Sequence, residues 1–389
     1  MQLKRILKNI DKPLLIISAI LFVFGLIMIF SASNITAFMK YSASPYRYFL
    51  KQSIFLAVSL IASLFLIQFY SKSYHIIATL AVYAIGVTLT LLLMYGSLKN
   101  KAISWIDLGF FSIQPSEFAK IIIIIWLSCY YGKHQEHLNK YGTVLYPILI
   151  SVVIAGLIFA QPDLGTTIIY SLIVATIFFM APISKEIRNK ILWIIMGGIV
   201  IMSLVLVGGG SSLLTERQKE RFDFSNPCST EKFYGKGNQV CNGYIAINNG
   251  KLLGVGLGNS TQKYLYLPEA HTDFIFAIIM EELGHLGCII ILFLYYLLIG
   301  RIIKIGRDSH NTRGFLICMG VAVYIILHIF VNLGGIFGIM PMTGVPLPFM
   351  SYGGSFAMCL VFALTFVQRI NVENCFYKEK NLKKLEKKK

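Results

Sequence analysis

Three ionisable side chains gather in the stretch LPEAHTD, residues 267–273. Glu269, His271 and Asp273 lie within five residues of one another, directly before a long apolar run. A carboxylate at the edge of a membrane is partly desolvated, which can move its pKa toward the range that a general base needs. Thr272 or Asp273 can instead serve only as the cap of the following helix. The stretch predicts either a proton acceptor or a capping group, with its neighbours as candidate substrate ligands.

A second set of polar residues stands in QPSEFAK, residues 114–120. Pro115 and Glu117 suit the first turn of a helix. Lys120 follows on the same helical face as Glu117. A Lys–Glu pair inside a membrane is costly unless it has a function. The motif therefore predicts a structural pair or a substrate-facing one, with Gln114 and Ser116 as further candidate ligands.

Two more polar segments join these candidates. QPDLGTT repeats the Gln-Pro-acid pattern, and its Asp163 is either a helix cap or a ligand. MPMTGVPLPFMSYGGS, residues 340–355, is too rich in Pro and Gly to be regular helix. At membrane depth such a segment must pack in protein or line a cavity. It is a plain re-entrant connector, or a cavity wall with Ser351, Tyr352 and Ser355 as polar ligands.

The elements that must position these residues are membrane helices. The chain has 389 residues, 56% hydrophobic and 14% charged. Apolar runs long enough to cross a bilayer, about 20 residues each, recur along it. We expect an all-α polytopic membrane protein of about ten transmembrane helices. The expected spans are 14–33, 49–69, 75–95, 117–131, 144–160, 166–182, 191–207, 274–299, 314–338 and 354–370.

Basic residues orient this arrangement. With both termini in the cytosol, the inner segments carry most of the Lys and Arg, whereas the short outer loops carry few. One long extracytoplasmic loop, about 208–272, separates helices seven and eight. Residues 1–371 then form a single transmembrane domain, followed by a basic cytosolic tail, 372–389. The net charge of +17 includes that tail, which is placed to meet anionic headgroups rather than nucleic acid.

This orientation brings all four polar segments to the outer face, each before a helix that runs inward. Helix N-termini carry a partial positive charge and suit a phosphate or diphosphate. Lys120 adds a full charge. A base, a cation and an anion site at the outer leaflet describe transfer from a lipid-linked diphosphate, or transport of such a lipid. Glu281 and Glu282 lie two turns deeper, where we expect them to pair helices or to bind partner backbone.

The seven cysteines show no metal-binding spacing. Cys228 and Cys241 both lie in the long outer loop, on the oxidising side of the membrane, where a disulfide between them is favoured. Two free thiols are the alternative.

The motifs QPSEFAK, QPDLGTT, GVGLGNSTQKYLYLPEAHTDFIFAIIMEELG and PMTGVPLPFMSYGGS resemble those of the SEDS family of bacterial cell-wall proteins, the FtsW, RodA and SpoVE types. Their order, spacing and ten-helix frame are similar over essentially the whole chain. The stretch STQKYLYLPEAHTDFIFA is more similar to the division type, FtsW, than to the elongation type, RodA.

The resemblance implies a peptidoglycan glycosyltransferase of the bacterial cytoplasmic membrane, placed at the division septum. It would polymerise lipid II with inversion and release undecaprenyl diphosphate. The family's essential aspartate falls on Asp273, the expected base, and its other sensitive positions fall on Trp105, Glu117 and Lys120. The implied partners are a class B penicillin-binding protein and other divisome or elongasome proteins. No cofactor is certain, and a divalent cation, Mg or Mn, is an option. The alternatives are a lipid II flippase and the elongation polymerase.

One departure from the family pattern lies in the outer loop. Family members commonly carry a Gln-Ser pair where this chain has Cys241 and Asn242. The loop is also lengthened by CSTEKFYGKG.

Overall fold

The computed structural model describes residues 2–95, 104–107, 109, 111–194, 227–229 and 237–387. In the first half these form α1 (Gln2–Lys8), α2 (Lys12–Tyr41), α3 (Arg47–Leu66), η1 (Ser71–Ser73), α4 (Tyr74–Tyr95), α5 (Pro115–Lys133), η2 (Gln135–His137), α6 (Tyr141–Ala160) and α7 (Leu164–Met180). In the second half they form α11 (Asn238–Gly250), α12 (Ile275–Arg307), α13 (Thr312–Ile336) and α14 (Gly354–Glu386). Strands β1 (Ile106–Asp107) and β2 (Ser112–Ile113) pair antiparallel.

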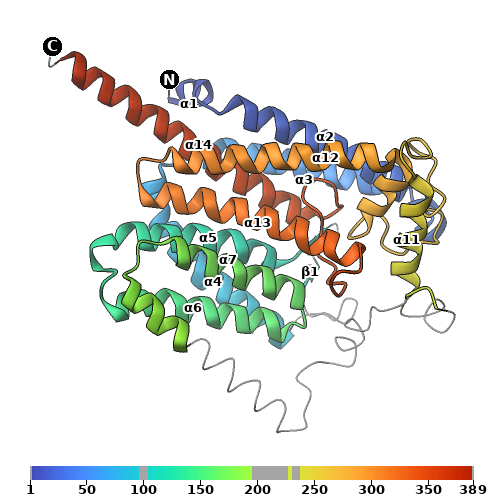
Figure 1. Ribbon diagram of the computed structural model, residues 1–389, viewed down its shortest axis with the longest axis horizontal. Coiled ribbons are helices and arrows are strands. Elements are labelled where there is room, and N and C mark those ends of the chain that lie inside the picture. Colours follow the sequence, from blue (N-terminus) through green and yellow to red (C-terminus); the bar gives the residue numbers. More distant parts are fainter. Residues whose placement is uncertain are drawn as a thin grey trace, which may run out of the picture.

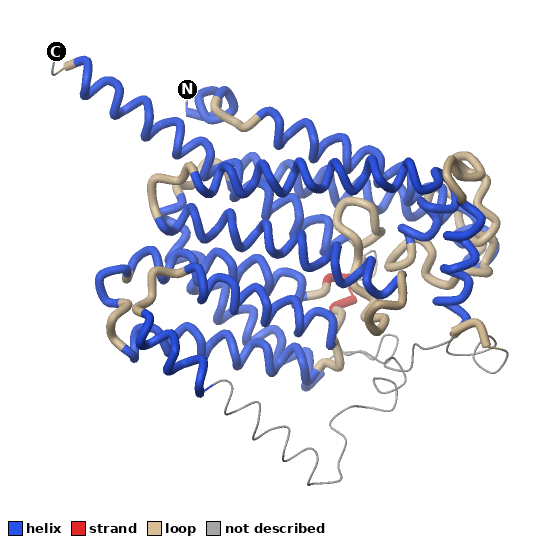
Figure 2. The backbone as a smooth tube through the Cα atoms, viewed as in Figure 1, coloured by secondary structure: helices blue, strands red, loops and turns tan. Residues whose placement is uncertain are grey.

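The long helices lie side by side, and the two chain ends lie at the same end of the bundle (Figure 1). α11 and the loops after it lie at the opposite end (Figure 2). Loops that connect the helices are also seen at the end where the termini lie. α13 occupies the centre, because it packs against α5, α7, α12 and α14. Four polar segments that are far apart in sequence therefore surround one central helix.

Seven helices in the described part of the chain are long and apolar enough to cross a membrane, and α7 is a shorter apolar helix. Nine of the ten expected spans coincide with helices. The tenth, 191–207, lies mostly outside the described residues, although 185–194 are helical. The described helices thus agree with the expected polytopic architecture.

Three helices continue well past the ends that the hydrophobic pattern predicts. α2 continues to Tyr41, α12 continues to Arg307, and α14 runs through the expected domain boundary at residue 371 to Glu386. No Gly or Pro interrupts α14 after Gly354, and Lys383 and Lys384 in its last turn favour the helix dipole. Hydropathy marks where the apolar part ends, but not where the helix ends.

Candidate functional site

A buried ion pair begins the site at the N-terminus of α5. Lys120 Nζ lies 2.8 Å from Glu117 Oε1, and their side chains are 0% and 4% exposed. Pro115 starts the helix, so both residues fall on its first two turns and on one face. The sequence predicted this pair correctly. Lys120 is fully enclosed, so in this conformation it acts through the groups that it contacts.

His328 of α13 connects the pair to residues 340–353, the proline-rich loop between α13 and α14. Its Nε2 lies 3.0 Å from Lys120 Nζ, and its Nδ1 lies 3.3 Å from the carbonyl oxygen of Pro346. An ammonium group only donates hydrogen bonds, so Nε2 accepts and Nδ1 carries the proton. The histidine therefore connects the α5 pair to the backbone of the loop.

Asn332 stands one turn further along α13. Its side-chain amide donates to the carbonyl oxygen of Asp273 at 2.7 Å and to that of Val345 at 2.8 Å. The residues at 328 and 332 thus hold both the proline-rich loop and the backbone of the expected base. Sequence reasoning missed them. The signal was present as two polar residues, four apart, inside an apolar run.

The segment after α13 is irregular, as its prolines and glycines predicted. Gly344 has φ +72°, and a Cβ built on it would lie 3.8 Å from Asp273 Oδ2. On the other side, a Cβ on Gly165 at the start of α7 would lie 2.7 Å from Val345 Cγ2. The loop is therefore held between α7 and Asp273, and at position 344 even an added Cβ would make only ordinary van der Waals contact with the carboxylate.

Asp273 does not cap α12. The helix starts at Ile275, its N-cap residue is Phe274, and no side chain makes a cap hydrogen bond. The Thr272 hydroxyl lies 3.1 Å from both Asp273 Oδ1 and Glu269 Oε2. Asp273 is half-buried and Glu269 is exposed. The capping alternative is excluded, and a hydroxyl links two carboxylates at the edge of the site.

His271 is buried among aromatic rings. Its ring centroid lies 4.5 Å from that of Tyr48 and 5.8 Å from that of Tyr352. The backbone N–H of Tyr352 donates to the carbonyl oxygen of His271 at 2.9 Å. Burial lowers the pKa of His271 to about 4, with nearby Lys40 adding to the effect and Glu269 opposing it. The imidazole is neutral at physiological pH and cannot supply a cation there.

The two Gln-Pro-acid motifs meet in space. Gln114 Nε2 donates to Asp163 Oδ2 at 2.9 Å, while Asp163 Oδ1 accepts from the backbone N–H of Thr166 at 3.1 Å. Asp163 is therefore a cap, as expected, and also a bridge from α7 to α5. The backbone N–H of Gln114 donates to the Ser355 hydroxyl at 3.1 Å, which adds the start of α14.

Three of the candidate substrate ligands, Ser351, Ser116 and Trp105, have surroundings that suggest a structural role or lie apart from Asp273. The Ser351 hydroxyl accepts from the backbone N–H of Leu347 at 2.8 Å and closes a turn of the loop. Ser116 is fully buried, and its hydroxyl has no partner in the described part of the chain. Trp105 is partly exposed beside β1. No contact joins the last two directly to the group around Asp273 and Asn332 among the described residues.

The long outer loop carries contacts at the positions that depart from the family pattern. Asn242 is buried and donates to the carbonyl oxygen of Tyr266 at 2.9 Å. The expected disulfide joins Cys241 to Cys228. Asn242 therefore holds the chain just before the LPEAHTD stretch. Residues 208–226 and 230–236 of the expected outer loop lie outside the described residues.

The deeper glutamates have a local role. Glu281 and Glu282 bind the loop that follows α11, and Glu282 also accepts from Ser31 of α2 at 2.7 Å. The expectation of helix pairing is correct in part for both, because Glu282 binds Ser31 of α2 and Glu281 accepts from Asn249 of α11 at 3.0 Å. Loop atoms are the main partners of both glutamates. Among the described residues, no three His, Cys, Asp or Glu side chains converge on a point where a metal ion would sit.

Comparison with known proteins supports one family. The model of the cell cycle protein family FtsW/RodA/SpoVE matches residues 12–375. The chain is 35% identical over 383 residues to a probable peptidoglycan glycosyltransferase FtsW of Bacillus subtilis, covering 95% of this chain and 92% of that protein. It is 32% identical over 374 residues to the protein of the same name from Coxiella burnetii, covering 93% and 96%.

Solved structures share the fold. A chain in a structure described as "Structural coordination of polymerization and crosslinking by a peptidoglycan synthase complex" matches with TM-score 0.74 and 22% identity, covering 94% of this chain and 98% of that one. The rod shape determining protein RodA of Thermus thermophilus matches with TM-score 0.64 and 22% identity, covering 93% and 96%. At this identity the likeness concerns the fold alone.

Proposed function

This chain belongs to the FtsW/RodA/SpoVE family of cell cycle proteins, and on that premise we propose that it is a peptidoglycan glycosyltransferase of the FtsW type. It joins lipid II units into glycan strands at the outer face of the cytoplasmic membrane. The names of its relatives support the activity. They favour the FtsW type over the elongation polymerase and over a flippase.

The surroundings of Asp273 carry the proposal. Its carboxylate is half-buried, it caps no helix, and Asn332 holds its backbone in place. Gly344 leaves room beside Oδ2. A carboxylate held in this way can accept a proton from a hydroxyl that reaches it from the outer leaflet.

In the proposed reaction, the acceptor sugar hydroxyl attacks the anomeric carbon of the donor. The new C–O bond forms as the bond from that carbon to diphosphate oxygen breaks, with inversion. Asp273 takes the hydroxyl proton, and the electron pair of the broken bond leaves with undecaprenyl diphosphate. Because diphosphate is already a stable anion, charge stabilisation aids its departure more than protonation does.

Glu117 and Lys120 position the site in this proposal. Lys120 holds His328, which holds the Pro346 carbonyl oxygen, so the pair sets the loop that faces Asp273. Contact between Lys120 and diphosphate requires the surrounding groups to open, because the side chain is enclosed.

A lipid-linked substrate also needs an apolar surface near the polar site. A cavity of about 260 Å³ lies between α4, α5 and α14, lined by apolar side chains that include Phe118, Ile121, Ile122 and Phe366. Phe118 is next to Glu117 in the first turn of α5. This placement suits the isoprenoid chain of a donor or acceptor.

The donor set also suits a divalent cation. Glu269 and Asp273 offer hard carboxylate oxygens on either side of the Thr272 hydroxyl. Mg²⁺ is commonly held by one or two carboxylates together with substrate phosphates. When bound, Mg²⁺ or Mn²⁺ would neutralise negative charge on the diphosphate.

The proposed partner is a class B penicillin-binding protein that crosslinks the glycan, within the division machinery at the septum. The structural neighbour from a peptidoglycan synthase complex that couples polymerisation and crosslinking supports this assignment.

The test is polymerisation of lipid II by the purified chain with its cognate class B penicillin-binding protein. Wild type is compared with Asp273→Asn and with Asp308→Asn, which changes an exposed aspartate at the other end of α12. We expect polymer from wild type and Asp308→Asn and none from Asp273→Asn, at equal complex formation. Equal polymer from all three would remove Asp273 as the base. No polymer from any, with protein-dependent crossing of lipid II in liposomes, would favour the flippase.

A further inference from the structure

α12 is broken near its outer end, and the kink loop, residues 251–266, lies in the break. Gly284 has φ +67° and ψ −174°, which no helix contains. The backbone N–H of Leu286 is bound by the kink loop instead of by its own helix, donating to the carbonyl oxygen of Leu252 at 3.2 Å. Kink loop and α12 therefore lie at the same level along the helix axis.

The length of α12 indicates where this level lies relative to the hydrocarbon layer of the membrane. Its cytosolic end carries Arg301, Lys304 and Arg307. About 20 helical residues cross the hydrocarbon layer, and counting that number outward from Arg301 arrives at about residue 281. The kink at Gly284 and the kink loop thus lie at the outer boundary of the hydrocarbon.

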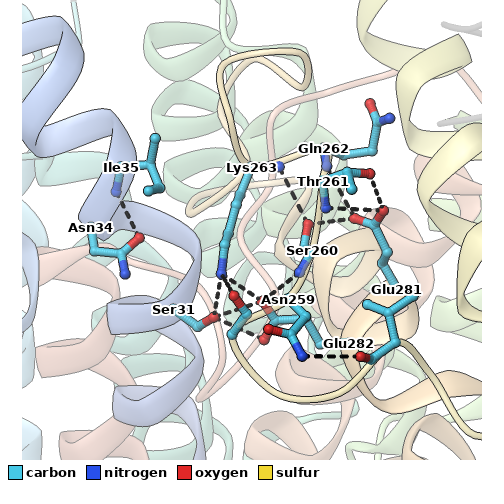
Figure 3. A network of polar contacts seen from close by, with 12 residues as sticks. Ser31, Asn34, Ile35, Asn259, Ser260, Thr261, Gln262, Lys263, Glu281 and Glu282 are labelled. Atoms are coloured by element: carbon cyan, nitrogen blue, oxygen red, sulfur yellow. Dashed lines mark hydrogen bonds and ion pairs between the residues drawn. The ribbon is translucent and has the colours of Figure 1, made fainter.

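Irregular backbone at this depth must be satisfied inside the protein. Glu281 does so for one end of the kink loop: its carboxylate accepts from the backbone N–H groups of Thr261 and Gln262, both at 3.3 Å, and from the Ser260 and Thr261 hydroxyls. Figure 3 shows these groups converging on Glu281. The carboxylate replaces water that lipid would exclude.

Lys263 is the cation of the kink loop whose side chain is buried, and Glu282 binds it. Lys263 Nζ lies 3.0 Å from Glu282 Oε1, and their side chains are 2% and 0% exposed. The same ammonium lies 3.3 Å from the Ser31 hydroxyl of α2 (Figure 3). It also lies 2.5 Å from the carbonyl oxygen of Gly258. An ion pair so fully enclosed presents no charge to the surface of the kink loop.

The surface of the kink loop is mainly apolar, and its exposed polar residues are Lys251, Asn259 and Thr261. Leu252, Leu253 and Leu257 are 61%, 73% and 53% exposed, and Tyr264 and Tyr266 are 51% and 62% exposed. Next to Leu252, the exposed face of α12 continues with Leu286, Ile289, Ile290 and Phe293. Those helix residues lie within the span and face lipid. The apolar face of the kink loop is a continuation of this lipid-facing surface.

We propose that the kink loop is inserted in the outer leaflet, with Leu252, Leu253 and Leu257 in contact with acyl chains and the tyrosines at headgroup level. Tyrosine is enriched at that interface. Glu281 and Glu282 serve as the internal acceptors that allow the insertion. The catalytic segment 267–273 follows directly, so the inserted loop fixes its height above the hydrocarbon.

Tryptophan fluorescence in lipid nanodiscs tests this proposal on the full chain without its partner. Leu253→Trp and Leu257→Trp are compared with Asn248→Trp, an exposed position on α11, each as the increment over the parent protein. Lipids brominated in the acyl chains should quench the increments at 253 and 257 at least twofold more than the increment at 248. Aqueous iodide should show the opposite order.

Two results would overturn the insertion. Equal iodide quenching at 253 and 248 would place the kink loop in water. Iodide quenching at 253 that disappears only when the penicillin-binding protein is added would make the apolar face a protein interface. Because the substituted side chains are exposed, each variant should unfold at the same temperature as the parent protein. A lower unfolding temperature would identify a misfolded variant.

Discussion

The side-chain amide of Asn332 lies 2.7 Å from the carbonyl oxygen of Asp273. The second hydrogen of the same amide is directed to Val345, at 2.8 Å. One residue near the C-terminal end of α13 thus joins the expected base to the proline-rich loop. Two backbone segments with no regular pairing of their own depend on it.

Asn332→Leu should therefore reduce glycan polymerisation by 10-fold or more, because both carbonyl oxygens lose their donor. A buried acceptor without a partner costs about 1–3 kcal/mol, so thermal stability should also fall modestly. Polymerisation kinetics at saturating lipid II measure the effect. Asn248→Leu, on the exposed face of α11, is the control. Unchanged turnover in Asn332→Leu would show that Asp273 is positioned by other contacts.

We expect the effects of substitutions at Glu117 and Lys120 on stability to be strongly coupled. Glu117→Gln or Lys120→Met alone leaves a buried charge without its partner, which costs roughly 3–5 kcal/mol. The double variant should be more stable than either single variant. Lys120→Arg should lose as much activity as Lys120→Met, because the larger guanidinium has no room where the lysine side chain is 0% exposed. Full rescue by arginine would instead indicate that positive charge on the diphosphate is what matters.

Stability should depend on the protonation of His271. Its pKa is lowered from 6.5 to about 4 in the fold, chiefly by burial. Between these values the unfolded chain binds a proton that the folded chain does not. Stability is therefore full above pH 6.5 and decreases as the pH falls toward 4, by roughly 3 kcal/mol.

Thermal unfolding measured from pH 8 to 4 tests this dependence. His271→Gln should flatten the decrease, whereas His137→Gln, an exposed position in η2, should leave it unchanged. An equally steep decrease in His271→Gln would assign the effect to other groups.

The Lys263–Glu282 pair should stabilise the kink loop. Lys263→Met leaves Glu282 charged and enclosed, with Ser31 as its remaining donor outside the loop. Destabilisation of roughly 3–5 kcal/mol is expected from either single change and less from Lys263→Met with Glu282→Gln. Lys251→Met, at an exposed position of the same loop, should have little effect. Additive losses in the double variant would show that the two charges are not coupled.

Removal of divalent cations should abolish polymerisation if Glu269 and Asp273 hold a metal. Glu269→Gln should then raise the Mg²⁺ concentration for half-maximal activity several-fold, because one carboxylate donor is lost. Glu136→Gln, exposed in η2, is the matched control. Full activity in excess chelator would exclude the cation.

Hydrophobic periodicity and charge determined most of the architecture, because lipid requires long apolar helices and the basic residues mark their inner ends. Nine expected spans agree with the described helices. The same reasoning identified the Glu117–Lys120 pair and the role of Asp163 at the start of α7, since each depends on residues close in sequence.

Contacts between distant segments were decided only by the tertiary structure. His328 and Asn332 look like isolated polar residues in an apolar run, and their partners at 346, 345 and 273 come from other segments. Ser351 looked like a cavity ligand but binds its own loop. The two deep glutamates looked like helix-pairing groups. Gly284 opens α12 there, and the folded chain fills the opening with a loop whose backbone needs those carboxylates.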